Sequence, residues 1–278
     1  MKRHLSHFIA AVMLFSAAVI SCKKGKDEEN VMTMTASTSG EVSISLAGIR
    51  TATIDWGDSS EKETKTLSSE TNIEFIHNYS TSKTHTIRIY GNNITKLYCS
   101  NNQLTSLDVS NNTEMTYLDC GNNLLTSLDV SNNNVLTNLL CYSNKLSSLD
   151  VSNNAILRLL HCGGNQLKSL DVSNAILKEL HCSHNQLASL DVSGNTTLEI
   201  LYCPVNSLTS LDLSNNIVLL SLFCGYNKLS DNALNAMFGT LHNHSIEGKG
   251  IVINDNPGTA TCIPSIAEDK GWRVVISN

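Results

Sequence analysis

The most reactive side chains in this sequence are seven cysteines that recur at an almost constant spacing. Thiolates can bind zinc, form disulfides or act as nucleophiles. Each cysteine follows a leucine by two residues, which puts both side chains on the inward face of a strand. Stacked side chains would lie about 4.8 Å apart, beyond the usual Cβ separation in a disulfide, and thiols in one line match no zinc spacing. We therefore expect a buried, unreactive row that consists of Cys99, Cys120, Cys141, Cys162, Cys182, Cys203 and Cys224.

Aspartates form a second row, at outward positions between two inward apolar residues. The row consists of Asp108, Asp129, Asp150, Asp171, Asp191 and Asp212. Carboxylates about 5 Å apart repel by on the order of 1 kcal/mol per pair, so something must offset the repulsion. Hydroxyls such as those of Ser106 and Ser110 can donate to them, or calcium can bridge them, since hard cations favour oxygen ligands. Nothing marks one carboxylate as an acid and its neighbour as a base, so the row does not predict catalysis.

The positions between the leucines and the cysteines form the variable outward row of the repeat. This row runs through Tyr98, Asp119, Leu140, His161, His181, Tyr202 and Phe223, and just beyond it lie Tyr142, His184 and Tyr226. Aromatic and apolar side chains that face solvent in a row suggest a ligand-binding surface, although cross-strand stacking would also explain them. The three histidines could approach one another across adjacent coils. Zinc would need a good tetrahedral set there, and we predict exposed histidines without a metal.

All of these rows come from one repeated pattern, L-x-C-x-x-N-x-L. Its copies begin at Leu97, Leu118, Leu139, Leu160, Leu180, Leu201 and Leu222. The interval is 21 residues except for one of 20, and six copies continue into L-D-[VL]-S. A fixed period of this length predicts a stacked solenoid. We expect two short strands in each coil, and a tighter turn without loss of register where Ser173-Asn174-Ala175 lacks the second asparagine.

An asparagine ends the first half of every coil. An inward amide at that position can bond to the main-chain groups that a turn leaves free, and to the next asparagine. We therefore assign a structural role to Asn102, Asn123, Asn144, Asn165, Asn185, Asn206 and Asn227.

The solenoid is flanked by two segments that lack the repeat. Period-two alternation predicts short antiparallel strands within residues 31–96, for example at 42–46, 53–56 and 86–90. Residues 230–278 suggest a helix capped by Ser230, one more coil motif at 251–256, a short helix opened by Pro264 and a last strand at 274–276. The predicted fold is mainly β: a solenoid of about seven coils over 97–229, with a β-rich N-terminal cap over 31–96 and a small α/β C-terminal cap over 230–278.

The N-terminus has the features of an export signal. Lys2 and Arg3 precede an apolar run over 8–20, which is shorter than the roughly 20 residues that span a bilayer. The run ends in Val-Ile-Ser-Cys, which resembles a bacterial lipobox. We predict a signal peptide over 1–21, lipidation of Cys22 and a polar tether over 22–30. The acidic residues of this tether also resemble the surface-export signal of Bacteroidetes lipoproteins, although a solvated linker would look the same.

The repeats resemble leucine-rich repeats, and the doubled L-x-L-x-x-N within about 21 residues resembles the subclass called IRREKO repeats. Signal, repeats and caps together resemble surface leucine-rich-repeat lipoproteins of Bacteroidetes. Asp55-Trp56-Gly57-Asp58-Ser59, followed by His77-Asn78-Tyr79, resembles the core of a PKD-like β-sandwich. The chain departs from the repeat family in having cysteine where leucine is usual, and in the 20-residue coil. The resemblance implies protein binding and adhesion, and it supplies no catalytic residues.

Composition narrows the function further. A net charge of −6 without basic clusters makes nucleic acid an unsuitable partner. The sequence contains no paired nucleophile and base, phosphate-binding loop or metal motif that would suggest an enzyme or a cofactor. We predict an outer-membrane lipoprotein, exposed at the cell surface and held by its lipid alone, that binds a protein of a host, another bacterium or the matrix. The alternative is a glycan-binding accessory lipoprotein.

Overall fold

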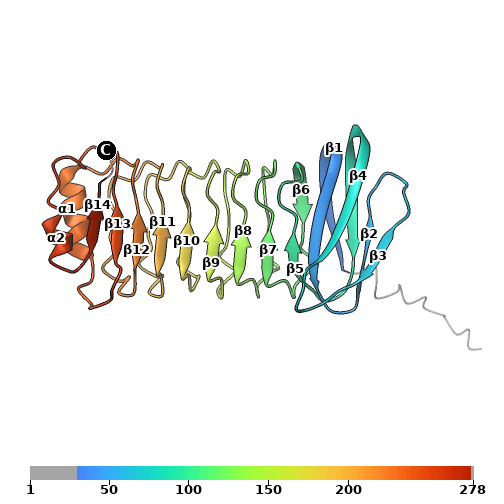
Figure 1. Ribbon diagram of the computed structural model, residues 1–278, viewed down its shortest axis with the longest axis horizontal. Helices are drawn as coiled ribbons and strands as arrows, with labels where there is room; N and C mark the ends of the chain where they lie inside the picture. Colours follow the sequence, from blue (N-terminus) through green and yellow to red (C-terminus); the bar gives the residue numbers. More distant parts are fainter. Residues whose placement is uncertain (1–29, 277–278) are drawn as a thin grey trace, which may run out of the picture.

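The computed structural model describes residues 30–276. The predicted signal peptide and Cys22 lie outside these residues. One 14-stranded sheet runs the length of the molecule, in the order β14-β13-β12-β11-β10-β9-β8-β7-β5-β1-β4-β2-β3, with β6 paired to β1. Figure 1 shows the coils side by side along the long axis, with strands β1 to β4 at one end and two helices at the other. Within the described part of the chain, no helix combines the length and apolar character needed to cross a bilayer.

The solenoid has about nine turns rather than the seven that we expected. Each turn contributes one parallel strand, and the two additional turns come from the C-terminal segment, which keeps the motif only in part. The strands are β5 (Ile94–Tyr98), β7 (Tyr117–Asp119), β8 (Asn138–Leu140), β9 (Leu159–His161), β10 (Glu179–His181), β11 (Ile200–Tyr202), β12 (Ser221–Phe223), β13 (Gly250–Val252) and β14 (Arg273–Val275).

The strands stack in register, so equivalent residues form straight columns. Leu139 lies opposite Leu160, and Leu160 lies opposite Leu180 although only 20 residues separate them. The shorter coil therefore keeps its register, as predicted. Its missing residue is absorbed in the turn, where Ala175 N–H donates to the oxygen of Val172 at 3.1 Å, as an asparagine does in other coils.

The interior consists of leucine columns, the cysteine row and the asparagine row. All seven cysteines are buried, which confirms the predicted burial of the row. Burial raises the pKa of Cys162 and Cys224 to about 12, because an apolar interior disfavours the thiolate. The asparagines bond to the preceding coil. For example, the Asn123 amide donates to the oxygens of Cys99 and Cys120, both at 3.0 Å, and its oxygen accepts from the main-chain N–H of Asn102. The partners are thus main-chain groups rather than the neighbouring amides.

The second halves of the coils differ from our prediction. Among the described residues, β6 (Leu104–Asp108) is the only strand formed by an L-D-[VL]-S segment, and it pairs with β1 rather than with another coil. In later coils the aspartate side chain accepts from the main-chain N–H two residues on, as Asp150 does from Ser152 at 2.9 Å. This local bond holds a turn in place of strand pairing.

The N-terminal cap is built on two long strands, β1 (Val31–Gly48) and β4 (Ile73–Tyr90), with β2 (Thr51–Asp55) and β3 (Glu63–Thr66) at its outer edge. β1 pairs antiparallel with both β5 and β6, so one strand covers both halves of the first coil. The Asn102 side chain bonds to the N–H and oxygen of Ser43, at 2.9 and 2.6 Å, as if β1 were a preceding coil. The boundary that we predicted between residues 96 and 97 falls within β5.

The C-terminal cap contains α1 (Asp231–Thr240) and α2 (Ser265–Glu268). As predicted, Ser230 caps α1 by accepting from the N–H of Ala233. Pro264 is the N-cap of α2, so this helix begins one residue later than expected. Buried residues of α1, among them Leu234 and Phe238, cover the end of the leucine columns.

Candidate binding surface

The variable outward row forms one continuous column on the strand face. Strand pairing places Tyr98, Asp119 and Leu140 side by side, and the column continues in register from strand to strand. Its remaining members are His161, His181, Tyr202 and Phe223. We call this column the carboxyl-side row, because it follows the inward leucine of each strand.

A second outward column precedes the leucines, and our reading of the sequence missed it. The repeated motif begins at leucine, so it does not include the position before it. This amino-side row consists of Lys96, Tyr117, Asn138, Leu159, Glu179, Ile200 and Ser221. The alternation of side chains in a strand would have placed these residues on the outer face too. The exposed face is therefore two residues wide.

Aromatic rings are in contact along much of this face. Tyr142 stacks on His161 with ring centroids 4.6 Å apart, and His161 and His181 are 5.2 Å apart. The series continues from His181 to Tyr202 at 5.8 Å, and from Tyr202 to Phe223 at 5.1 Å. Cross-strand stacking is thus present, as one of our two explanations required. The stacked rings are nonetheless not fully covered, since Tyr202 is 36% exposed.

His161 is neutral at physiological pH. Burial, followed by the charge of His181, lowers the pKa of His161 to about 4. No three histidine, cysteine, aspartate or glutamate side chains between residues 30 and 276 come together as a metal-binding group. The structure therefore gives the zinc hypothesis at His161, His181 and His184 no support, nor the calcium hypothesis for the aspartate row.

The residues beyond the row occupy the turns. His184 and Tyr226 have φ values of 51° and 54°, in the left-handed region, and Tyr226 is 56% exposed. Tyr142 lies differently, since its ring covers Gly121 of the preceding coil. A Cβ on Gly121 would collide with that ring, so this glycine makes room for the tyrosine.

The aspartate row is stabilised from within its own coils. Each side chain accepts from the N–H two residues on, for example Asp129 from Ser131 at 2.9 Å. Bonds with Ser131 and Ser152 lower the pKa of Asp129 and Asp150. Serines following the aspartates thus offset the repulsion, as our first explanation proposed, and the main-chain N–H takes part as well as the hydroxyl.

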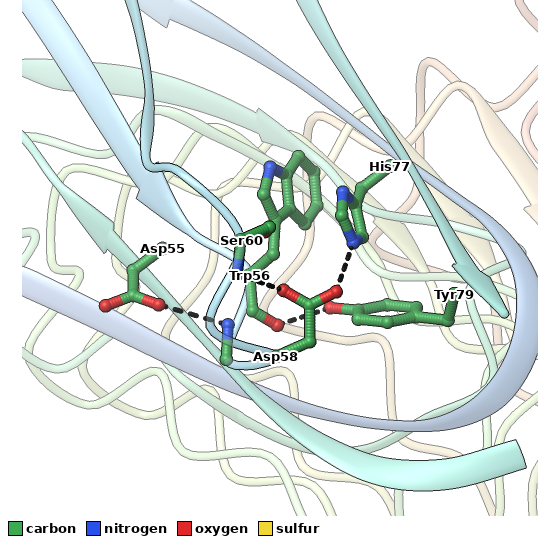
Figure 2. Close-up of polar contacts among 7 residues, drawn as sticks. Asp55, Trp56, Asp58, Ser60, His77 and Tyr79 are labelled. Carbon is green, nitrogen blue, oxygen red and sulfur yellow. Dashed lines mark hydrogen bonds and ion pairs between the residues drawn. The ribbon is translucent and has the colours of Figure 1, made fainter. Parts of the chain in front are cut away.

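A second polar cluster lies in the N-terminal cap (Figure 2). Asp58 and His77 are joined by a hydrogen bond of 2.7 Å, and His77 stacks on Trp56 with ring centroids 4.9 Å apart. The Tyr79 hydroxyl donates to the main-chain oxygen of Trp56. A side-chain bond from Ser60 and the contact with His77 lower the pKa of Asp58 to about 2. These groups are mutually satisfied, so the cluster ties the 55–60 turn to β4.

No protein-family profile matches this sequence, and no curated protein matches it. Solved structures do. The leucine-rich-repeat domain of a Shigella effector is 26% identical, over 66% of this chain and 81% of that one, with a TM-score of 0.53. The internalin InlF from Listeria monocytogenes is 22% identical, over 66% of this chain and 56% of that one, with a TM-score of 0.54. The fold is a leucine-rich-repeat solenoid.

A third similar structure is the functional domain of InlJ from Listeria monocytogenes, described as including a cysteine ladder. It is 30% identical over 63% of this chain and 47% of its own, with a TM-score of 0.35. This chain thus spans about half the length of the two Listeria structures. The narrower resemblances, to IRREKO repeats, Bacteroidetes lipoproteins and PKD-like domains, stay predictions.

Proposed function

We propose that this chain is a non-enzymatic binding protein that holds a protein partner against its strand face. The observation that supports the proposal is the run of stacked rings from Tyr142 to Phe223 on a rigid parallel sheet. Aromatic side chains in register bury much area with little loss of conformational entropy, and they dominate the energetics of protein interfaces. The fold that this chain shares with effector and internalin domains is consistent with such a role.

We also propose that the chain is an outer-membrane lipoprotein exposed at the cell surface, held by a lipid on Cys22. This proposal rests on the sequence of the N-terminus alone. Metabolic labelling with an alkyne palmitate should label the native chain and not Cys22→Ser. Protease treatment of intact cells should remove the native protein from the surface. A native chain that is not labelled would contradict the lipid anchor. A chain that the protease reaches only after the cells are lysed would contradict exposure at the cell surface.

The binding surface can be tested with two matched variants of the full chain. The face variant replaces His161, His181, Tyr202 and Phe223 by serine. The control variant replaces four exposed apolar residues away from the rows by serine: Ile156, Ile176, Ile217 and Val218. Native protein and both variants are applied to an array of purified extracellular and bacterial surface proteins. We expect partners whose signal is lost with the face variant and retained with the control variant.

Two results would contradict this proposal. Partners that bind the face variant as well as the native chain would place the interface elsewhere. Binding confined to a parallel glycan array, and lost with the face variant, would favour the glycan-binding alternative, because aromatic rings also stack on sugars. Equal urea midpoints for the two variants establish that lost binding does not reflect unfolding.

A further inference from the structure

Asp119 is the one carboxylate in the carboxyl-side row, and its surroundings differ from those of the aspartate row. Tyr98 lies beside it on the neighbouring strand. Tyr117 precedes it by two residues on its own strand, so both side chains face outward. Tyr142 reaches the same place from the next coil, where its ring covers Gly121. Three tyrosines therefore surround one carboxylate, and all four side chains are half-buried.

The contacts within this group fix its geometry. The rings of Tyr98 and Tyr117 lie 4.7 Å apart. One oxygen of Asp119 accepts from the N–H of Gly121 at 3.0 Å, which holds the carboxylate in place. Burial raises the pKa of Tyr117 to about 12, with the nearby Tyr98 and Asp119 adding to the effect. Burial also raises the pKa of Tyr142, and the nearby charge of Asp119 raises it further.

Within residues 30–276, the charge of Asp119 has no counterion. Its hydrogen bonds come from neutral groups, Gly121 and Ser100. Among residues 30–276, no lysine, arginine or histidine forms an ion pair with it, including Lys96, which faces outward next to Tyr117. Partial burial raises the pKa of Asp119, so the free protein bears the cost of a partly desolvated charge.

The chemistry of this group selects a cation. The faces of tyrosine rings are electron-rich and attract cations, and a partly desolvated carboxylate interacts more strongly with a charge than an exposed one does. The described residues offer no set of three metal ligands, which favours an organic cation. A planar guanidinium can stack on a ring while it bonds the carboxylate, which an ammonium does less well.

A shallow hollow adjoins this group on the side of the cap. It is lined by Glu41, Ser43 and Ser45 of β1, and by Tyr98 and Ser100 of the first coil. Ser100 also bonds to Asp119, so this residue links the hollow to the carboxylate. A second carboxylate and several hydroxyls there suit the polar main chain and further positive charge of a basic segment.

We propose that Asp119, with Tyr98, Tyr117 and Tyr142, forms a receiving site for an arginine side chain of the protein partner. This inference rests on the proposed function, and it divides the strand face into two parts. The acid–tyrosine site, as we call these four residues, anchors one arginine and sets the register of the partner. The rings from His161 to Phe223 contact apolar residues further along the same segment.

The test uses N-acetyl-arginine amide as the probe and N-acetyl-citrulline amide, which has nearly the same shape without the charge, as its control. Both are titrated into the full chain carrying ¹³C-labelled tyrosine. We expect saturable shifts of the Tyr98, Tyr117 and Tyr142 ring signals with arginine only, while Tyr202 is unaffected. This comparison needs no substitution, so it does not depend on the folding of a variant.

Two charge variants then locate the site. Asp119→Asn should weaken arginine binding at least tenfold. Asp150→Asn removes an equal charge from the aspartate row and should leave binding unchanged. Equal binding of citrulline, or equal affinities of the two variants, would overturn the proposal. A chain that binds its partner through Tyr202 and Phe223 but does not bind arginine would overturn this site and leave the proposed function intact.

Discussion

The side-chain amide of Asn144 donates to the main-chain oxygen of Cys120 in the preceding coil, at 3.0 Å. The same amide donates to Cys141 and Tyr142 of its own coil, both at 3.2 Å, and its oxygen accepts from the N–H of Leu125 at 3.0 Å. One side chain thus closes a turn and joins it to its neighbour. Because the arrangement recurs in every coil, each repeat of about 21 residues forms one coil that is bonded to the coil before it.

Replacing that amide should weaken the stack. Asn144→Leu leaves the buried N–H of Leu125 without its acceptor and removes one of two bonds to the oxygen of Cys120, so we expect the free energy of unfolding to fall by about 1–3 kcal/mol. The measurement is a urea melt followed by circular dichroism. Asn153→Leu is the control, because Asn153 makes a single exposed bond, to Ser131. Equal midpoints for both variants would contradict the structural role of the row.

The residue before each asparagine of the asparagine row has a left-handed backbone. In one coil this position holds a residue that is unfavourable in that conformation. Val205 has φ of 56°, whereas the equivalent positions include Asn122 at 49° and Gly164 at 67°. A β-branched residue is strained in that region, so Val205→Asn should stabilise the protein by about 1 kcal/mol. The reverse change, Asn122→Val, should destabilise it by a similar amount. Thermal melts that move in the same direction for both variants would refute this explanation.

These examples show what the sequence pattern could and could not predict. Inward leucines, cysteines and asparagines follow from spacing alone, because a solenoid must bury the same positions in every coil. The second halves of the coils were mispredicted because L-D-V alternates like a strand, whereas the Asp150 side chain bonds its own backbone. The grouping of Tyr117 with Asp119 and Tyr142 depends on a column that the motif omitted. The stacking of His161 on Tyr142 depends on residues 19 positions apart in the sequence, and no local pattern reports it.

The seven buried cysteines should not react with thiol reagents while the protein is folded. In a Cys22→Ser background, Ellman's reagent should react first with Cys262, which is only partly buried. The seven ladder thiols should react only when denaturant opens the stack, because burial raises their pKa and excludes the reagent. Cys262→Ser should abolish the early reaction. Several fast thiols in that double variant would show that the solenoid opens or that the row is exposed.

Acidification should destabilise the strand face through His161. Its pKa is about 4 in the folded protein and near 6.5 when unfolded, so the unfolded state binds more protons between these values. The free energy of unfolding therefore falls as the pH drops from about 6.5 to 4. The lowered pKa values of Asp129 and Asp150 affect stability only at more acidic pH, below their ordinary value of 3.8.

Urea melts at pH 7, 5.5 and 4 should show a smaller decline in the free energy of unfolding for His161→Gln than for the native chain. His184→Gln, at an exposed turn, should decline like the native chain, and a His161→Gln curve parallel to it would contradict the assignment.

The C-terminal cap depends on a lysine that closes a helix end. The Lys270 ammonium donates to the oxygens of Phe238 and Leu241, at 3.1 and 2.9 Å, at the end of α1. A cation there bonds free carbonyls and interacts favourably with the helix dipole. Lys270→Met keeps the aliphatic stem but loses these charge-assisted bonds, so we expect about 1–3 kcal/mol less protection of the α1 amides in hydrogen exchange. Lys228→Met, outside the cap, is the control. Protection should be unchanged in the central coils of both variants, since each coil contacts only its neighbours. Uniform loss along the whole stack would instead indicate that the cap and the solenoid unfold as one unit.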